Sequence, residues 1–403
     1  MSWTAEDRLL LFCCRGRLGR EAKNIAIEAA KRGIDWNSFL QKARENGVSA
    51  IVSRRLTEVK NLFPEIPSFI SEELKKDYYL NAAKNALIFE ELRRVLKSFR
   101  ESGLPAIVLK GAALASMVYE NLALRPMTDV DLLVKKEDLF LADERLKLLG
   151  YMPSDRSAND VNFSSSYLTS LDYRNSSPNS PSFHIHWHFI NSTVPNESYI
   201  HHVRMENIWR DAEKADIADG ETSVMSFHHL IIHLSEHALR VSHSANKLCF
   251  FCDVNEAVRF YGSKLDWSKL VDESFKFHLS RMVYLSLYFT TQFLKTGIPE
   301  DVLLRLKPER LSLGEKILMK SVLNNRHVAG LSYFVHLSMN KGLSRKMKFV
   351  WRTFFPPRQI LAQRSYCPLE KINYSHYFRR IGEVFSHVLR IRGRRFPSGD
   401  RAA

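Results

Sequence analysis

The chain has 403 residues, of which 45% are hydrophobic and 26% charged, with a formal net charge of +15. This composition excludes a disordered or fibrous protein, and the length allows two or three structural units around a large core. No apolar run reaches the roughly 18–20 residues of a transmembrane helix, and the five cysteines lack the pattern of a disulfide framework. We therefore expect a globular protein of a reducing compartment.

The N-terminal segment is expected to stay in the mature, cytoplasmic protein, because it carries acids where a secretion signal carries Lys or Arg. From residue 6 to about residue 58 apolar residues recur at helical spacing, and Asp35 begins one of the predicted helices. A long helix is predicted from about residue 71 to residue 101. The chain thus opens with a helical region.

A short apolar run at residues 106 to 109 predicts a buried strand, and Lys110-Gly111 closes it. Residues 112 to 120 contain neither Pro nor Gly and predict a helix, so Gly111 lies at a strand-to-helix turn. Such a turn directs backbone N–H groups toward one point, where an anion can bind.

The next stretch, Arg125 to Val134, reads Arg-Pro-Met-Thr-Asp-Val-Asp-Leu-Leu-Val. Alternate side chains of a strand point to the same face, so Asp129 and Asp131 project together while the apolar residues behind them enter a sheet. A pair of carboxylates suits a hard divalent cation, and Mg²⁺ held in this way commonly also contacts substrate phosphates. The pattern therefore predicts a metal site for phosphate chemistry.

A helix is expected at residues 137 to 149, followed by a polar, irregular segment from 154 to 182, in which a strand near 163 to 173 remains open. Residues 183 to 189 alternate between apolar side chains and three histidines, which predicts a strand. The histidines on its second face are His184, His186 and His188.

The C-terminal part is predicted to be mostly helical, with apolar residues at helical spacing in 226–241, 248–261, 281–294, 313–323 and 377–391. Most of the net positive charge lies between Lys341 and Arg395, where fourteen basic residues face only Glu370 and Glu383. A basic and amphipathic tail favours a polyanionic partner, which could be nucleic acid, a phosphorylated carrier or an anionic membrane surface.

Three of these motifs together resemble the polymerase-β-type nucleotidyltransferases, and more closely the bacterial family of uncharacterised nucleotidyltransferases. They are Leu109-Lys110-Gly111, Arg125 to Val134 and His186-Trp187. The resemblance extends more weakly into both helical flanks and so covers most of the chain.

The resemblance implies an α+β fold, in which a polymerase-β-like core of mixed sheet and helices is flanked by N-terminal helices and a mostly helical C-terminal region. We accordingly expect an N-terminal helical region at 1–75, the nucleotidyltransferase core at 76–219, a helical C-terminal domain at 220–376 and a basic amphipathic tail at 377–403.

The resemblance also implies a reaction, the transfer of a nucleoside monophosphate from a nucleoside triphosphate to an acceptor hydroxyl with Mg²⁺ or Mn²⁺. Asp129 and Asp131 would hold the metal. The residues expected around the triphosphate are Lys110, Gly111, Ala112 and Arg125. The family does not define the acceptor, which could be a small molecule, a saccharide, a protein or RNA.

Two positions depart from the family pattern. Ala112 follows Gly111 where the wider superfamily prefers Gly or Ser, and His184 stands where relatives commonly carry a third carboxylate. His184 could act as a neutral base or bind a softer ion such as Mn²⁺, but it removes one negative charge from the site. The alternative function is therefore a catalytically weakened nucleotide-binding module, which could dock on a membrane surface or a polyanion.

Other clusters carry simpler interpretations. A zinc site on the three strand histidines remains an alternative, although zinc usually recruits ligands from more than one element. His233 and His237 share a helix face, and Cys249 and Cys252 lie in an apolar helix without a second ligand pair. Packing within the core is the expected role of these four residues.

Overall fold

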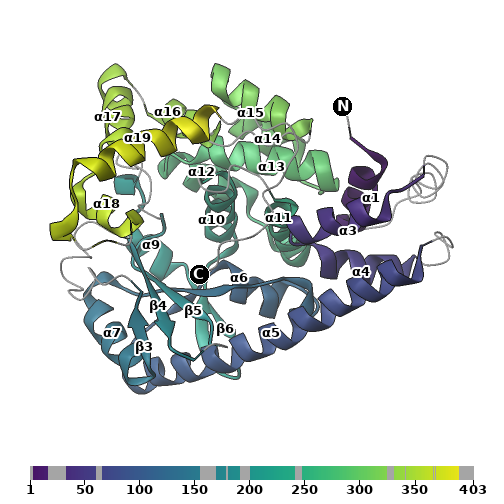
Figure 1. The fold of residues 1–403 in the computed structure, drawn as a ribbon, viewed down its shortest axis with the longest axis horizontal. Coiled ribbons are helices and arrows are strands. Elements are labelled where there is room, and N and C mark those ends of the chain that lie inside the picture. Colours follow the sequence, from purple (N-terminus) through teal and green to yellow (C-terminus); the bar gives the residue numbers. More distant parts are fainter. Residues whose placement is uncertain are drawn as a thin grey trace.

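The computed structural model of the protein describes residues 3–16, 33–59, 66–154, 169–177, 180–190, 200–240, 247–324, 331–340, 342–365, 367 and 369–389. A mixed sheet with helices on both sides forms the middle of the chain, and helices precede and follow it (Figure 1). This arrangement confirms the expected α+β class. No helix in these ranges combines the length and apolarity needed to cross a bilayer.

The sheet has seven strands in the order β3-β4-β5-β2-β1-β7-β6. Strand β1 pairs antiparallel with β2 and parallel with β7, β2 pairs parallel with β5, and the remaining neighbours are antiparallel. The strands are β1 Ile107–Val108, β2 Asp129–Leu133, β3 Tyr151–Pro153, β4 Ser170–Asn175, β5 Ser182–His186, β6 Glu213–Asp216 and β7 Glu221–Val224.

The helices fall into three groups along the sequence. The first group is α1 Ala5–Cys14, α3 Trp36–Glu45, α4 Ser49–Glu58 and α5 Ser68–Glu101. The second is α6 Lys110–Ala113, α7 Leu139–Leu148 and α9 Met205–Arg210. The third is α10 Phe227–Leu239, α11 Leu248–Tyr261, α12 Trp267–Lys276, α13 Ser280–Leu294, α14 Glu300–Leu306, α15 Leu313–Leu323, α16 Leu331–Met339, α17 Leu343–Phe354, α18 Arg358–Ser365 and α19 Tyr374–Leu389.

The two faces of the sheet pack into separate cores. Val130 and Leu132 of β2 face α5 and α7, whereas Leu133 belongs to the larger core built by the N-terminal and C-terminal helices. In Figure 1, α5 runs beneath the sheet and α10, α11 and α12 lie above it. Because side chains alternate along a strand, Asp129 and Asp131 share the face of Leu133 and point toward the C-terminal helices.

Several predicted elements agree closely with the structure. Helices α11 and α15 have the predicted limits, and the long helix α5 begins at Ser68, three residues before its predicted start. The Asp35 side chain caps α3 by accepting a hydrogen bond from the Ser38 backbone N–H at 3.0 Å. Strong helical periodicity in the sequence was therefore sufficient to locate these helices.

Other elements differ from the prediction. The helix expected at 112–120 begins at Lys110 and continues as a π-helical turn, Leu114–Val118. The strand expected at 183–189 ends at His186, after which the Trp187 backbone N–H still donates to the Thr169 carbonyl at 3.0 Å while the chain bends. Predictions that fall on residues 17–32, 155–168 and 390–403 lie outside the described residues.

Candidate metal and nucleotide site

The site begins with the two aspartates of β2. The Asp131 side chain is 3% exposed, whereas that of Asp129 is 33% exposed. The parallel register of β5 sets His184 beside Asp131 and His186 beside Leu133. The period-two pattern of both strands thus brings the aspartates and the two histidines to one face of the sheet.

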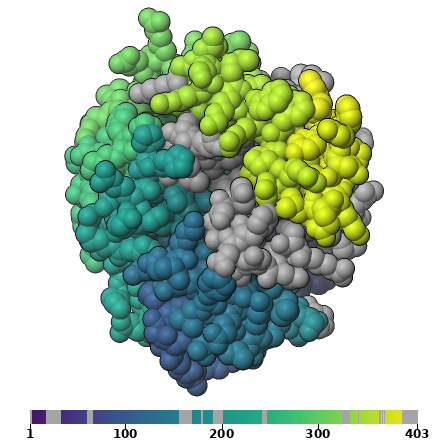
Figure 2. Space-filling view, turned by 90° about the vertical axis from the view of Figure 1, so that its left-hand side faces the viewer, coloured from purple at the N-terminus to yellow at the C-terminus, as the bar shows by residue number. Residues whose placement is uncertain are grey.

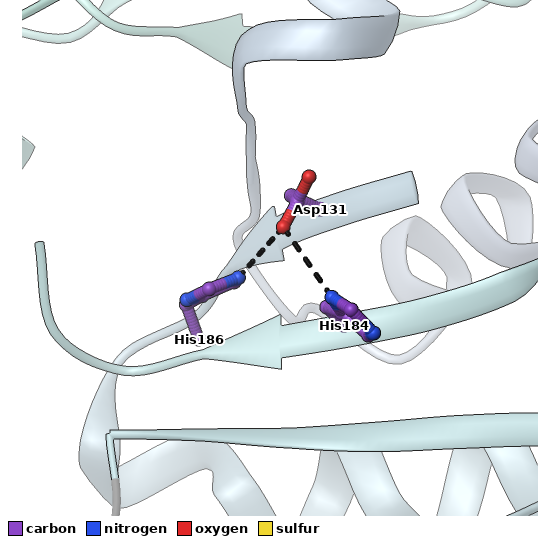
Figure 3. A group of neighbouring side chains, drawn as sticks. All are labelled: Asp131, His184 and His186. Atoms are coloured by element: carbon purple, nitrogen blue, oxygen red, sulfur yellow. Dashed lines mark hydrogen bonds and ion pairs between the residues drawn. The ribbon is translucent and has the colours of Figure 1, made fainter. Parts of the chain in front are cut away.

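Asp131 is the centre of this group. Its Oδ1 atom lies 2.9 Å from His186 Nε2 and 3.1 Å from Lys110 Nζ, and His184 Nδ1 is 3.7 Å away. Figure 3 shows both imidazole rings directed at this one oxygen. Burial alone raises the pKa of the Asp131 carboxyl, but the Lys110 charge and the two histidines outweigh it and hold the pKa well below its usual range. Asp131 is therefore a carboxylate.

A third carboxylate, which the sequence did not predict, comes from β4. The antiparallel register of β4 and β5 places Asp172 opposite His184, and Asp172 Oδ1 lies 3.1 Å from His184 Nε2. The Ser154 hydroxyl donates to Asp172 Oδ2 at 2.9 Å, and the exposed Arg174 Nε donates to the same oxygen at 3.0 Å. Asp172 thus stands behind His184, on the side away from Asp131.

His184 therefore lies between carboxylates on both of its ring nitrogens. Its Nδ1 atom is 3.3 Å from Asp129 Oδ2, and its Nε2 atom faces Asp172. Burial lowers the pKa of this histidine, but the surrounding carboxylates of Asp131, Asp172 and Asp129 overcome that effect and raise the pKa to about 10. In the arrangement described, the imidazole balances the charge of the surrounding acids.

The donor set fits a divalent cation. Asp131, His184 and His186 each offer a ligand atom within 4.8 Å of the others, and the partly exposed Asp129 carboxylate lies beside them. Carboxylate oxygens suit Mg²⁺ and Mn²⁺, and an imidazole nitrogen is a donor that Mn²⁺ accepts more readily than Mg²⁺. The three acids outnumber the Lys110 ammonium and the His184 imidazolium, so the local charge favours a cation. A cation that takes a nitrogen of His184 as a ligand would displace the proton from that nitrogen.

A second group that could hold a metal comprises Asp211, His228 and His229. Here Lys269 Nζ lies 3.1 Å from Asp211 Oδ2 and the Arg210 Nε donates to Asp211 Oδ1 at 2.9 Å. Two basic side chains thus neutralise a single carboxylate, so the local charge is less favourable to a cation than at Asp131.

The predicted phosphate-binding turn lies against the aspartates. The Leu109 backbone N–H donates to the Asp131 carbonyl at 3.0 Å, so α6 begins with Lys110 immediately beside the carboxylate of Asp131. Gly111 and Ala112 follow in the first turn and are buried. A Cβ on Gly111 would lie 3.0 Å from Arg125 Nη1, so glycine lets the guanidinium approach the turn.

Arg125 itself forms a buried ion pair with a distant helix. Its Nη2 atom donates to Asp253 Oδ2 at 2.9 Å and its Nε atom to Asp253 Oδ1 at 3.3 Å, and the Tyr119 hydroxyl donates to the same Oδ1 atom at 2.9 Å. Asp253 is 1% exposed and belongs to α11. This pair ties the loop that leads into β2 to the C-terminal helices.

The same loop is held from α5 by Asn85, which is fully buried. Its Nδ2 atom donates to the Leu122 carbonyl at 2.5 Å and to the Arg125 carbonyl at 2.8 Å. We expect Asn85→Ala to lower the free energy of unfolding by about 1–3 kcal/mol, because two partly buried carbonyls lose their donor. Urea denaturation measures this change, and Asn81→Ala, which removes one contact to the Ala123 carbonyl from a less buried position, is the matched control. An equal loss in both variants would contradict the special role of Asn85.

The alternative clusters are placed differently. His188 lies beyond the end of β5 and its Nδ1 atom accepts a hydrogen bond from the Ile190 backbone N–H at 3.0 Å, so it is not part of the group around Asp131. His233 is 1% exposed within the helical core, and burial holds its pKa well below the usual value. Cys252 is buried in α11, which agrees with a packing role.

A mixed sheet that carries acids and a Lys-Gly turn on its central strands defines the class of the protein as a nucleotidyltransferase-like α+β protein. The family model for an uncharacterised nucleotidyltransferase matches residues 32–295, which is more than half of the chain. The chain therefore belongs to this family of uncharacterised nucleotidyltransferases. No curated protein gives a significant match.

Proposed function

We propose that the protein transfers a nucleoside monophosphate from a nucleoside triphosphate to an acceptor hydroxyl with a divalent cation, Mg²⁺ or Mn²⁺. The observation that carries this proposal is the convergence of Asp129, Asp131 and Asp172 on neighbouring strands around His184. Membership of a nucleotidyltransferase family supports the same reaction class.

The proposed roles follow from position. Asp129 and Asp131 would hold the cation, which when bound would offset the charge of the triphosphate and orient it. Lys110 lies beside these acids and would offset further phosphate charge. Gly111 and Ala112 would bring their backbone against the triphosphate. Arg125 would contribute through Nη1, which faces Gly111 and also donates to the Pro126 carbonyl at 3.1 Å, while its other nitrogens bind Asp253.

His184 and Asp172 together would take the place of the family's third carboxylate. The His184 ring faces Asp129 and Asp131, and Asp172 supplies the negative charge one strand further away. This arrangement returns to the site a charge that a histidine alone would remove. A cation bound at Asp129 and Asp131 would offset the negative charge that keeps His184 protonated. We propose that the neutral ring then receives the proton of the acceptor hydroxyl and that Asp172 holds the ring in position.

The alternative is a nucleotide-binding module that retains the site but has lost most of its turnover, because His184 replaces a carboxylate. For both the enzyme and the module we propose a cytoplasmic location and a contact of the tail at 377–403 with an anionic surface. The enzyme would in addition need an acceptor, which the proposal does not identify. Release of pyrophosphate from a panel of triphosphates and acceptors, with Mg²⁺ or Mn²⁺, tests the proposed reaction. Absence of release with every pair would favour the module.

Two variants separate these possibilities further. If Asp172 supports His184, Asp172→Asn lowers turnover by about 10–100-fold, the usual effect of removing a group that orients a ligand. Arg174→Gln is the control, because it removes only the exposed partner of the same carboxylate. Pyrophosphate release measures both. Activity that is absent in the wild type and present in His184→Asp would overturn the enzyme proposal in favour of the module.

A further inference from the structure

Helix α17 exposes large apolar side chains along one face. Leu343 is 78% exposed, Met347 62% and Trp351 64%. These residues are four apart, so they lie above one another on the helix surface, and Phe355, 38% exposed, follows at the same interval. A surface helix of a globular protein normally turns such a face inward.

The orientation of α17 is held by contacts on its other side. Phe349 is 5% exposed and its ring stacks on His336 of α16. The Arg380 Nε atom of α19 donates to the Thr353 carbonyl at 3.1 Å. Because the buried side is already packed in this way, the apolar residues at 343, 347 and 351 face outward.

Basic residues accompany this apolar face. Arg345, Lys346 and Lys348 are exposed on α17, and Arg352 is half-buried. The helix contains no acid, and the first acid after Lys341 is Glu370. At about 100° per residue around the helix, Lys346 and Lys348 flank the apolar residues, whereas Arg345 lies on the opposite side. We call the set Leu343, Lys346, Met347, Lys348 and Trp351 the apolar-basic face of α17.

Helix α19 adds exposed aromatic surface beside α17. Tyr374 is 84% exposed and Phe378 is 73% exposed. The rings of Phe355 and Tyr377 stack at 6.4 Å between centroids, which joins the end of α17 to α19. Figure 2 shows these C-terminal helices together on one side of the molecule, drawn in lime green and yellow.

We propose that the apolar-basic face of α17 binds the surface of an anionic lipid bilayer, with the helix lying parallel to the membrane. Leu343, Met347 and Trp351 would enter the boundary between headgroups and acyl chains, a depth that tryptophan favours. The flanking bases would bind anionic headgroups. This inference is independent of the proposed nucleotidyl transfer.

Charge and surface chemistry favour a bilayer over the other occupants. A second copy packed on the same face would bring two sets of positive charges together, because a twofold interface pairs a patch with itself. Nucleic acid would pair with the bases and stack on Trp351, but it offers no apolar phase for Leu343 and Met347. An anionic bilayer matches both kinds of side chain.

Co-sedimentation of the full chain with vesicles tests the proposal. We expect binding to vesicles of phosphatidylcholine with 30% phosphatidylserine at an affinity about tenfold or more above that for pure phosphatidylcholine. The triple variant Leu343→Ser, Met347→Ser and Trp351→Ser should reduce this binding by about tenfold or more, and Lys346→Gln with Lys348→Gln should reduce it and flatten its salt dependence.

The matched control is the triple variant Leu80→Ser, Leu148→Ser and Leu304→Ser, which removes equally exposed leucines from α5, α7 and α14 and should bind like the wild type. Equal binding of the α17 triple variant and the wild type to anionic vesicles would overturn the proposal. Absence of vesicle binding in the wild type would also overturn it. In that case, a dimer or single-stranded RNA binding that is present in the wild type and lost in the α17 triple variant would identify the other occupant.

Discussion

Replacing Asp129 and Asp131 together by Asn is expected to abolish the metal dependence of nucleotide binding. In the wild type, Mg²⁺ or Mn²⁺ should tighten triphosphate binding, whereas in the double variant the affinity should be the same with and without metal. Any turnover should fall by at least about a hundredfold, because loss of metal ligands removes several kcal/mol of charge stabilisation. Isothermal titration with a non-hydrolysable triphosphate measures the binding, and pyrophosphate release measures the turnover.

The single variant Asp129→Asn separates loss of the site from loss of the fold. The Asp129 side chain is 33% exposed, whereas Asp131 is buried against Lys110 and His186. Asp129→Asn should therefore melt like the wild type while losing most of the metal response. Asp216→Asn removes an exposed carboxylate from β6 of the same sheet and serves as the control. Unchanged metal-dependent affinity in the folded double variant would contradict the proposed site.

Asp253→Ala is expected to cause the largest loss of stability. It would leave the Arg125 guanidinium buried without its carboxylate and the Tyr119 hydroxyl without its acceptor. Removing one partner of a buried ion pair typically costs about 3–5 kcal/mol, a large part of the roughly 5–15 kcal/mol that stabilises a folded domain. Chemical denaturation followed by circular dichroism measures the change.

Two further variants test the cause of that loss. Tyr119→Phe removes only the hydroxyl and should cost less than Asp253→Ala. Arg125→Met combined with Asp253→Leu replaces the pair by apolar side chains and should recover much of the stability, because no unpaired charge stays buried. A double variant as unstable as Asp253→Ala would show that packing, and not the unpaired guanidinium, accounts for the effect.

The parts of the candidate site that share a strand could be predicted from the sequence. Asp129 and Asp131 are two residues apart, as are His184 and His186, and the period of a strand then determines that each pair shares a face. Lys110 was expected near the metal and the triphosphate only from the resemblance to the nucleotidyltransferases. The structure brings all five of these side chains together, and their catalytic or binding roles remain proposals.

Contacts between distant elements could not be predicted in this way. Asp172 lies in a polar segment without clear alternation, and only the antiparallel pairing of β4 with β5 sets it opposite His184. Asp253 is 128 residues from Arg125, and no local pattern connects them. Helix α17 was not among the predicted helices, and its contacts with α16 and α19 decide which of its sides is buried.

The sequence by itself determined the long helices, the two aspartates on one strand face and the turn before them. These features depend on residue spacing along a single element, which backbone geometry converts directly into a shared face. The tertiary structure decided strand register, the third carboxylate and the ion pair between Arg125 and Asp253. Those features depend on which elements pack together, and many residues across the whole chain determine that packing through buried area and hydrogen bonding.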